Sequence, residues 1–169
     1  MTQKNKTEII AEPGKQEMFI IREFDFPREL VFRAHTDPEI YAKWVGPNGL
    51  ETEIVEWNYQ DGGSYRFRQT CNGMLFEFFG VNHEVTAPER IVGTFEYTGL
   101  PERGHVILGK LRFEELEGNR TRLVSHSVFF SAEDRDAMIQ SGMEKGVNEG
   151  YEKLDAILAN DQAAGSAAI

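Results

Sequence analysis

The feature that most constrains this chain is an apolar stripe near its C-terminal end, spaced like one face of an α-helix. The stripe consists of Ile139, Met143, Val147, Tyr151, Leu154 and Leu158. A helix with one apolar face must bury that face against another element. We therefore predict one long helix, capped at its start by the Ser131 hydroxyl, that packs on a sheet formed by the preceding residues.

Three glycines recur every four residues in the first half of that helix, at Gly142, Gly146 and Gly150. Each glycine inside a helix costs about 1 kcal/mol relative to alanine. We expect a close approach between the helix and the sheet to offset this cost. The alternative is a loosely formed, mobile N-terminal half of the helix.

About seven strands are expected before the helix, because apolar residues alternate in short segments separated by turn signals. These segments span 18–26, 51–59, 64–71, 74–85, 91–97, 106–115 and 121–130. Asn72-Gly73 is the strongest hairpin signal in the chain, and short connections require antiparallel neighbours. Two short helices should follow the first strand, since Pro27 and Asp37-Pro38 suit helix starts and Gly46-Pro47 suits an end.

Both ends of the chain read as flexible tails. Residues 1–15 are polar and contain Pro13-Gly14, while residues 161–169 are rich in small side chains. The 169 residues fit one domain, so we expect a single domain over 16–160.

The charge balance argues against two classes of partner. Asp and Glu number 28 against 18 Lys and Arg, for a net charge of -10, which repels nucleic-acid backbones and anionic lipids. No apolar run approaches the ~20 residues that span a bilayer, and residues 1–10 lack the apolar core of a signal peptide. With one cysteine, Cys71, a disulfide framework is impossible. We expect a cytoplasmic protein with no nucleic-acid or membrane partner.

The sequence offers little catalytic or cofactor chemistry. The four histidines have no metal-ligand spacing, and Gly62-Gly63 lies in a turn rather than a nucleotide loop. We therefore name no catalytic residue, metal or cofactor. His83 and His126 fall in expected strands, where structural hydrogen bonding is the simpler role. Arg66, Arg68 and Arg112 would form an anion-binding patch or solvated ion pairs.

Several short motifs resemble a known superfamily in their order and spacing. They are Pro27-Arg28-Glu29-Leu30-Val31-Phe32, Thr36-Asp37-Pro38-Glu39, Trp44-Val45-Gly46-Pro47, Gly62-Gly63-Ser64-Tyr65-Arg66-Phe67, Ala87-Pro88-Glu89-Arg90-Ile91-Val92 and Gly150-Tyr151-Glu152-Lys153-Leu154. The chain resembles the SRPBCC (START-like) superfamily, in the branch homologous to the C-terminal domain of the activator of the heat-shock chaperone ATPase. The resemblance implies an α+β helix-grip (START/Bet v-like) fold over 16–160, with a curved antiparallel sheet wrapped round the long helix.

The resemblance also implies a cavity between the sheet and the helix. Strand alternation points an aromatic set inward, and Trp44 would lie at the rim, as part of a lid or of the core. The candidate ligand-binding residues are Trp44, Tyr65, Phe67, Phe95, Tyr97, Phe113, Met143 and Val147. The inward face of 74–85 is ambiguous, and a bulge near Gly80 would mix its two faces. The alternative to a cavity is a fully packed core.

Three functions fit these expectations. The first is a START-like module that binds a hydrophobic or amphipathic small molecule. The second is a protein-interaction module of the stress response that regulates a chaperone, and the third is a polyketide cyclase or aromatase. A non-enzymatic role fits the residues better than an enzymatic one. The sequence leaves open whether the protein forms a homodimer.

Overall fold

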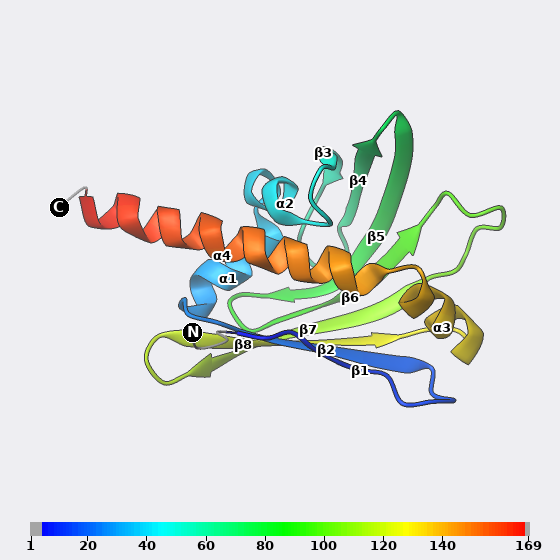
Figure 1. Ribbon diagram of the computed structural model, residues 1–169, viewed down its shortest axis with the longest axis horizontal. Helices are drawn as coiled ribbons and strands as arrows, with labels where there is room; N and C mark the ends of the chain where they lie inside the picture. The colour runs from blue at the N-terminus through cyan, green and yellow to red at the C-terminus, as the bar shows by residue number, and fades with distance from the viewer. Residues whose placement is uncertain (1–4, 168–169) are drawn as a thin grey trace.

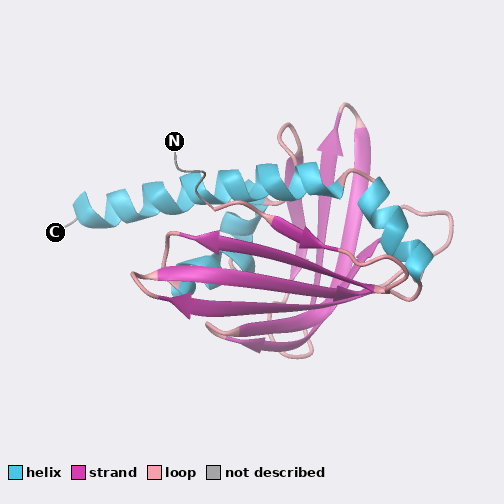
Figure 2. Cartoon of the chain, turned by 60° about the horizontal axis from the view of Figure 1, so that its bottom comes forward, coloured by secondary structure: helices cyan, strands magenta, loops and turns pink. Residues whose placement is uncertain are grey.

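An antiparallel sheet curves beneath a long C-terminal helix in the computed structural model, which describes residues 5–167 (Figures 1 and 2). The strands are β1 (Glu8–Ile10), β2 (Glu17–Phe24), β3 (Glu51–Trp57), β4 (Ser64–Cys71), β5 (Met74–Thr86), β6 (Arg90–Tyr97), β7 (Ile107–Leu116) and β8 (Arg120–Val128). The helices are α1 (Arg28–Thr36), α2 (Pro38–Trp44), α3 (Ala132–Gln140) and α4 (Met143–Ala167). This arrangement confirms the predicted α+β helix-grip fold.

The sheet has eight strands in the order β1-β2-β8-β7-β6-β5-β4-β3, and each neighbouring pair is antiparallel. The hairpin between β4 and β5 turns at Asn72 and Gly73, whose φ angles are 50° and 77°, as a tight two-residue turn requires. Sequence analysis gave about seven strands. The additional strand, β1, lies in the expected N-terminal tail and was missed because three residues are too few to show a period.

The two short helices are fixed by side chains at their ends. The Asp37 carboxylate caps α2 by accepting from the backbone N–H of Glu39 at 3.0 Å. The last carbonyls of α1 need donors, and two indoles supply them. Trp44 Nε1 donates to the carbonyl of Ala34 at 2.8 Å, and Trp57 Nε1 donates to that of Thr36 at 2.7 Å. The helices are thereby attached to each other and to β3.

The C-terminal helical region is two helices rather than the single predicted one. Ser131 caps α3, as predicted, by accepting from the N–H of Asp134 at 3.0 Å. The chain then turns at Gly142, where φ is +84°, a conformation that L side chains rarely adopt. Ile139 consequently belongs to α3 and is 37% exposed, so the apolar stripe of α4 begins at Met143.

Gly146 and Gly150 allow a close approach, but to the end of α2 and its loop rather than to the sheet as predicted. A Cβ atom at Gly150 would lie 3.0 Å from the carbonyl oxygen of Trp44, and one at Gly146 would lie 3.2 Å from Pro47 Cδ. The Glu149 carboxylate also accepts from the N–H of Asn48 at 2.7 Å. The 44–48 segment therefore rests directly on α4.

The far end of α4 extends past the sheet in both ribbon views (Figures 1 and 2). Residues 159–164 are all exposed, yet the helix continues to Ala167, into the segment expected as a C-terminal tail. The alanines there have high helix propensity, which favours this continuation.

The core lies between the concave face of the sheet and the helices. Phe24, Leu123, Leu154 and Leu158 are buried there. One charged side chain joins them: Arg22, 4% exposed on the concave face of β2. Its guanidinium donates to both carboxylate oxygens of Asp155 on α4, at 3.1 and 2.5 Å. This bidentate pair connects the sheet to the long helix through charge-assisted hydrogen bonds.

Two irregularities change the direction of side chains in the sheet. The edge strand β3 shifts register between Ile54 and Glu56. In β5 the shift falls between Asn82 and Glu84, a little later than the bulge expected near Gly80. Before this bulge Phe78 and Asn82 face the concave side, whereas Val81 is 40% exposed on the outer side. The bulge thus resolves the ambiguous pattern of 74–85.

Candidate functional site

Two pockets that share part of their walls lie between the concave face of the sheet and the helices, and we call them the sheet lobe and the helix lobe of the cavity. The sheet lobe has a volume of about 280 Å³ and extends over the middle of β6, β7 and β8. The helix lobe has a volume of about 300 Å³ and lies beneath the 45–47 loop and the start of α4. The residues that line both lobes are Trp44, Phe95, Met138, Met143 and Tyr151.

Six of the eight candidate ligand-binding residues line this cavity. Trp44, Phe95 and Met143 border both lobes. Tyr65 borders the sheet lobe, and Phe67 and Val147 border the helix lobe. Trp44 combines the two roles considered for it, because it is only 6% exposed and also forms cavity wall.

The other two candidates, Phe113 and Tyr97, lie outside both lobes. Phe113 faces inward but is covered by α1, where its ring contacts Phe32 and His35 at centroid distances of 5.0 and 5.2 Å. The Tyr97 ring lies against Gly99, where an added Cβ would come within 2.5 Å of its Cζ atom. Strand alternation gives the face of a side chain and not which helix or loop covers it.

Several cavity residues were missed by sequence reasoning. They are His35, Tyr41, Tyr59, Asn82, Ser125, Ser127 and Met138. Met138 was missed because α3 was merged with α4, and Asn82 because its strand contains a bulge. Tyr41 and Tyr59 come from α2 and from the segment after β3, whose packing leaves no periodic signal. An alternation of serines along β8 is a detectable sign that its inward face is not purely apolar.

Stacked aromatic rings form the wall of the helix lobe. The Phe78 ring stacks on those of Phe67 and Phe95, with centroid distances of 5.0 and 5.3 Å. The polar side chain at this lobe, Gln69, donates to the carbonyl of Val45 at 3.1 Å and to Thr52 Oγ1 at 3.3 Å. This lobe therefore presents an apolar, π-rich surface.

The sheet lobe is more polar. The Tyr65 hydroxyl donates to the carbonyl of Thr94 at 2.7 Å. Asn82 is 1% exposed, and among the described residues its Nδ2 atom has no hydrogen-bond partner. This buried donor therefore belongs to the wall of the sheet lobe.

The titratable side chains around the cavity are held neutral. Burial lowers the pKa of His35 to about 4, against the opposing effect of its hydrogen bond to the carbonyl of Val31. Burial also raises the pKa of Tyr151 to about 12 and those of Tyr41 and Tyr59 further. At neutral pH these groups are therefore uncharged hydrogen-bonding groups rather than charged acids or bases.

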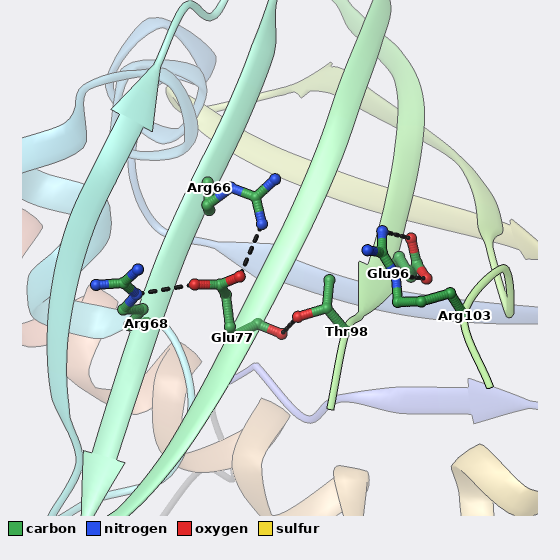
Figure 3. Close-up of polar contacts among 6 residues, drawn as sticks. All are labelled: Arg66, Arg68, Glu77, Glu96, Thr98 and Arg103. Atoms are coloured by element: carbon green, nitrogen blue, oxygen red, sulfur yellow. Dashed lines mark hydrogen bonds and ion pairs between the residues drawn. The ribbon is translucent and has the colours of Figure 1, made fainter. Parts of the chain in front are cut away.

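The outer face of the sheet carries ion pairs, as one of the two alternatives for its arginines predicted. Glu77 accepts from Arg66 Nη1 at 2.7 Å and from Arg68 Nε at 2.8 Å (Figure 3). Hydrogen bonds to Arg103 and to the Gly104 N–H lower the pKa of Glu96 to about 2. Arg112 Nη2 lies 3.2 Å from Glu114 Oε1. All three arginines considered for an anion-binding patch are therefore paired with carboxylates.

Comparison with known proteins identifies the family. Residues 25–159 match the family model described as "Activator of Hsp90 ATPase homolog 1-like protein". The chain belongs to this family. The match begins just after β2 and spans the elements from α1 into α4, which form most of the cavity wall, and it supports the SRPBCC resemblance.

Solved structures of bacterial proteins share the fold of this Hsp90-activator-like protein. Protein Ms6760 from Mycobacterium smegmatis aligns with a TM-score of 0.82 at 19% identity, covering 90% of this chain and 97% of that one. A protein from Rhodobacter sphaeroides aligns at 0.79 with 25% identity, covering 90% and 99%. One from Arthrobacter aurescens aligns at 0.81 with 25% identity, covering 90% and 91%.

A search of curated proteins gave no match. Within residues 5–167, this family member has no helix that combines the length and the apolar character needed to cross a bilayer.

Proposed function

We propose that this protein binds a hydrophobic or amphipathic small molecule in its two-lobed cavity. The observation that carries the proposal is the cavity itself, whose lobes of about 280 and 300 Å³ are walled by uncharged side chains. Concave, mostly apolar pockets with a few polar groups are typical ligand sites. The family match supports a START-like binding module. In our proposal the ligand lies between sheet and helix, and the protein acts in the cytoplasm.

A cavity-filling variant tests this proposal. Gly109 lines the sheet lobe, and a Cβ there would meet no atom closer than 3.8 Å, so Gly109→Leu fills space without a backbone clash. We combine it with Val147→Phe, which fills the helix lobe. Binding of 2-ethylnaphthalene, followed by calorimetry, should weaken at least about tenfold in this double variant, a loss of roughly 1.4 kcal/mol.

The matched control is Leu108→Ser, which changes the neighbouring residue on the outer face, where Leu108 is 51% exposed. It should bind the probe as the wild type does. Equal affinity in all three proteins, or no binding to the wild type by any neutral apolar probe, would refute the proposed function.

The natural ligand can be sought by native mass spectrometry. The purified protein is compared with the same sample after denaturation, and a mass excess present only in the folded state identifies a retained molecule. Loss of that excess in the cavity-filled double variant would assign the molecule to the cavity.

A second candidate function is regulation of a heat-shock chaperone during stress, which the printed name of the family favours. An exposed apolar contact point suited to a protein partner is formed by Met74 and Leu75, which are 60% and 59% exposed at the β4–β5 hairpin. In a mixing assay with an Hsp90-type chaperone, the wild type should stimulate ATP hydrolysis and Met74→Ser/Leu75→Ser should not. Unchanged hydrolysis with the wild type would exclude this candidate.

A further inference from the structure

Asn82 has a hydrogen-bonded backbone and an unpaired side-chain donor in the wall of the cavity. Its backbone N–H donates to the carbonyl of Gly63 and its carbonyl accepts from the N–H of Gly62, both at 2.8 Å. These two hydrogen bonds hold the Asn82 backbone against the turn before β4. Its side-chain Nδ2 atom is nevertheless unpaired within residues 5–167, although a buried donor without a partner destabilises a fold. An amide retained under these conditions points to a partner outside the chain.

Gly93 allows the Asn82 side chain to pack closely against the neighbouring strand. Gly93 is the register partner of Asn82 on β6, and a Cβ there would come within 3.0 Å of Asn82 Oδ1. Both residues line the sheet lobe. Glycine inside a strand weakens it and often marks the close approach of another group. The amide is therefore part of the wall of the sheet lobe, and its Nδ2 atom is buried there without a partner among the described residues.

The charge of the lining restricts the ligand. Every residue that lines either lobe is uncharged at neutral pH, His35 included, because burial lowers its pKa to about 4. Burying a carboxylate or a phosphate against such a wall would leave the charge without a counter-ion, which is strongly unfavourable. An uncharged acceptor has no such penalty.

The two lobes differ in what they offer a ligand. In the helix lobe, Gln69 already uses its donor on Val45 and Thr52, and the remaining wall is largely aromatic and aliphatic. In the sheet lobe, Asn82 keeps a free donor. The cavity is thus polarised, with a hydrogen-bond donor at one end and an apolar surface at the other.

We propose that Asn82 Nδ2 donates a hydrogen bond to a carbonyl oxygen of an uncharged amphipathic ligand, whose apolar part occupies the helix lobe. This inference rests on the proposed binding function and narrows its ligand to neutral molecules with a strong acceptor, such as ketones, lactones or amides. Fatty-acid anions and phosphorylated lipids are excluded from the class.

Three naphthalenes of similar size test the proposal. 2-Acetylnaphthalene carries a carbonyl, 2-ethylnaphthalene carries none, and 2-naphthoate is charged. Calorimetric affinities are measured for the wild type, for Asn82→Leu, and for the outer-face control Val81→Ser. The ratio of ketone to hydrocarbon affinity should fall about tenfold in Asn82→Leu, the effect of one buried hydrogen bond. It should be unchanged in Val81→Ser, and 2-naphthoate should be the weakest ligand of the wild type.

A second measurement keeps the test independent of variant stability. The side-chain amide signal of Asn82 is assigned by its loss in Asn82→Leu or, if that variant does not fold, in the more conservative Asn82→Asp. Its ¹H and ¹⁵N shifts in the wild type should move with 2-acetylnaphthalene and much less with 2-ethylnaphthalene.

The outcomes separate this inference from the proposed function. If both neutral probes bind the wild type but the ratio is the same in Asn82→Leu, the Asn82 hydrogen bond is refuted while the binding function stands. Tighter binding of 2-naphthoate than of the ketone would refute the neutral ligand class. If no neutral probe binds the wild type, the proposed function itself fails.

Discussion

His35 shows how one residue can be a hydrogen-bonding group and an acid-sensitive part of the core at once. It is 5% exposed, its ring contacts Trp44 and Phe113 edge-on at 4.9 and 5.2 Å, and its Nδ1 atom lies 2.8 Å from the carbonyl oxygen of Val31. That carbonyl can only accept, so Nδ1 carries the proton of the neutral ring. The neutral form is therefore the one the fold selects.

The stability of the protein should consequently fall in mild acid. The unfolded chain protonates His35 near its ordinary pKa of 6.5, whereas the folded protein does so only near 4. The unfolded state binds the extra proton between these values, so stability is complete above pH 6.5 and is lost as pH falls toward 4. The loss should reach about 3 kcal/mol, measured by urea unfolding at a series of pH values.

His35→Phe keeps an aromatic ring at this position and should remove most of that pH dependence between pH 6.5 and 4.5. The window stops at pH 4.5 because Glu96 adds a loss of stability of its own at lower pH. Arg103 lowers the pKa of folded Glu96 to about 2, so the unfolded chain binds the extra proton below the ordinary pKa of 4.5. The control is His126→Gln, which removes a histidine from the outer face of the sheet and should leave the His35 effect in place. An undiminished slope in His35→Phe would contradict the assignment.

At the scale of elements, the contact between α4 and the 44–48 segment determines the shape of the helix lobe. Gly146, Gly150, Pro47 and Val45 all line that lobe, so the glycines that allow the contact also form part of the cavity wall. The two glycines meet different neighbours: a backbone carbonyl at Gly150 and the edge of a proline ring at Gly146.

This difference predicts unequal effects of alanine. Gly150→Ala places a methyl group 3.0 Å from the Trp44 carbonyl oxygen, and the resulting strain should destabilise the fold by about 1 to 2 kcal/mol. Gly146→Ala meets Pro47 at 3.2 Å, and the ~1 kcal/mol gain in helix propensity should roughly cancel the cost. Chemical unfolding measures the free energy of unfolding of the two variants. Equal destabilisation would contradict the predicted difference between the backbone contact and the proline contact.

Sequence patterns predicted the elements that are long and periodic, and they failed where a single residue interrupts the period. The strand alternation of Tyr65 and Phe67 gave the correct face, because every second residue of β4 faces the core. Gly142 was read as a helical glycine because a spacing of four residues cannot reveal a positive φ. Phe113 was placed in the cavity because alternation is silent about α1, which covers it. Asn82 was missed because its distinctive feature is a buried amide nitrogen without a hydrogen-bond partner among the described residues, which a sequence pattern cannot show.

At the scale of the whole molecule, the Arg22–Asp155 pair joins the two layers that enclose the cavity. Arg22 comes from the second strand and Asp155 from the last helix, 133 residues apart. The guanidinium carbon also lies 4.7 Å from the centroid of the Phe24 ring and 5.9 Å from that of Tyr151. The pair therefore holds α4 against the sheet next to Tyr151, a wall residue of both lobes.

Breaking this pair should be costly, and replacing it should not. Asp155→Ala leaves the buried guanidinium unpaired and should lower the free energy of unfolding by about 2 kcal/mol, a value reduced for the partial exposure of Asp155. In Arg22→Met/Asp155→Leu an apolar contact replaces the ion pair, so most of that loss should be recovered. The measurement is thermal or urea unfolding of both proteins, and a double variant weaker than Asp155→Ala would contradict this account.

The edges of the sheet have a consequence for how copies of the molecule meet at high concentration. The sheet ends on one side at the three-residue strand β1 and on the other at β3, whose register shifts at a bulge and whose glutamates Glu51, Glu53 and Glu56 are exposed. A short edge, a bulge and like charges each oppose the addition of a strand from another molecule. Aggregation through continued strand pairing is therefore disfavoured at neutral pH, although the sheet never closes into a barrel.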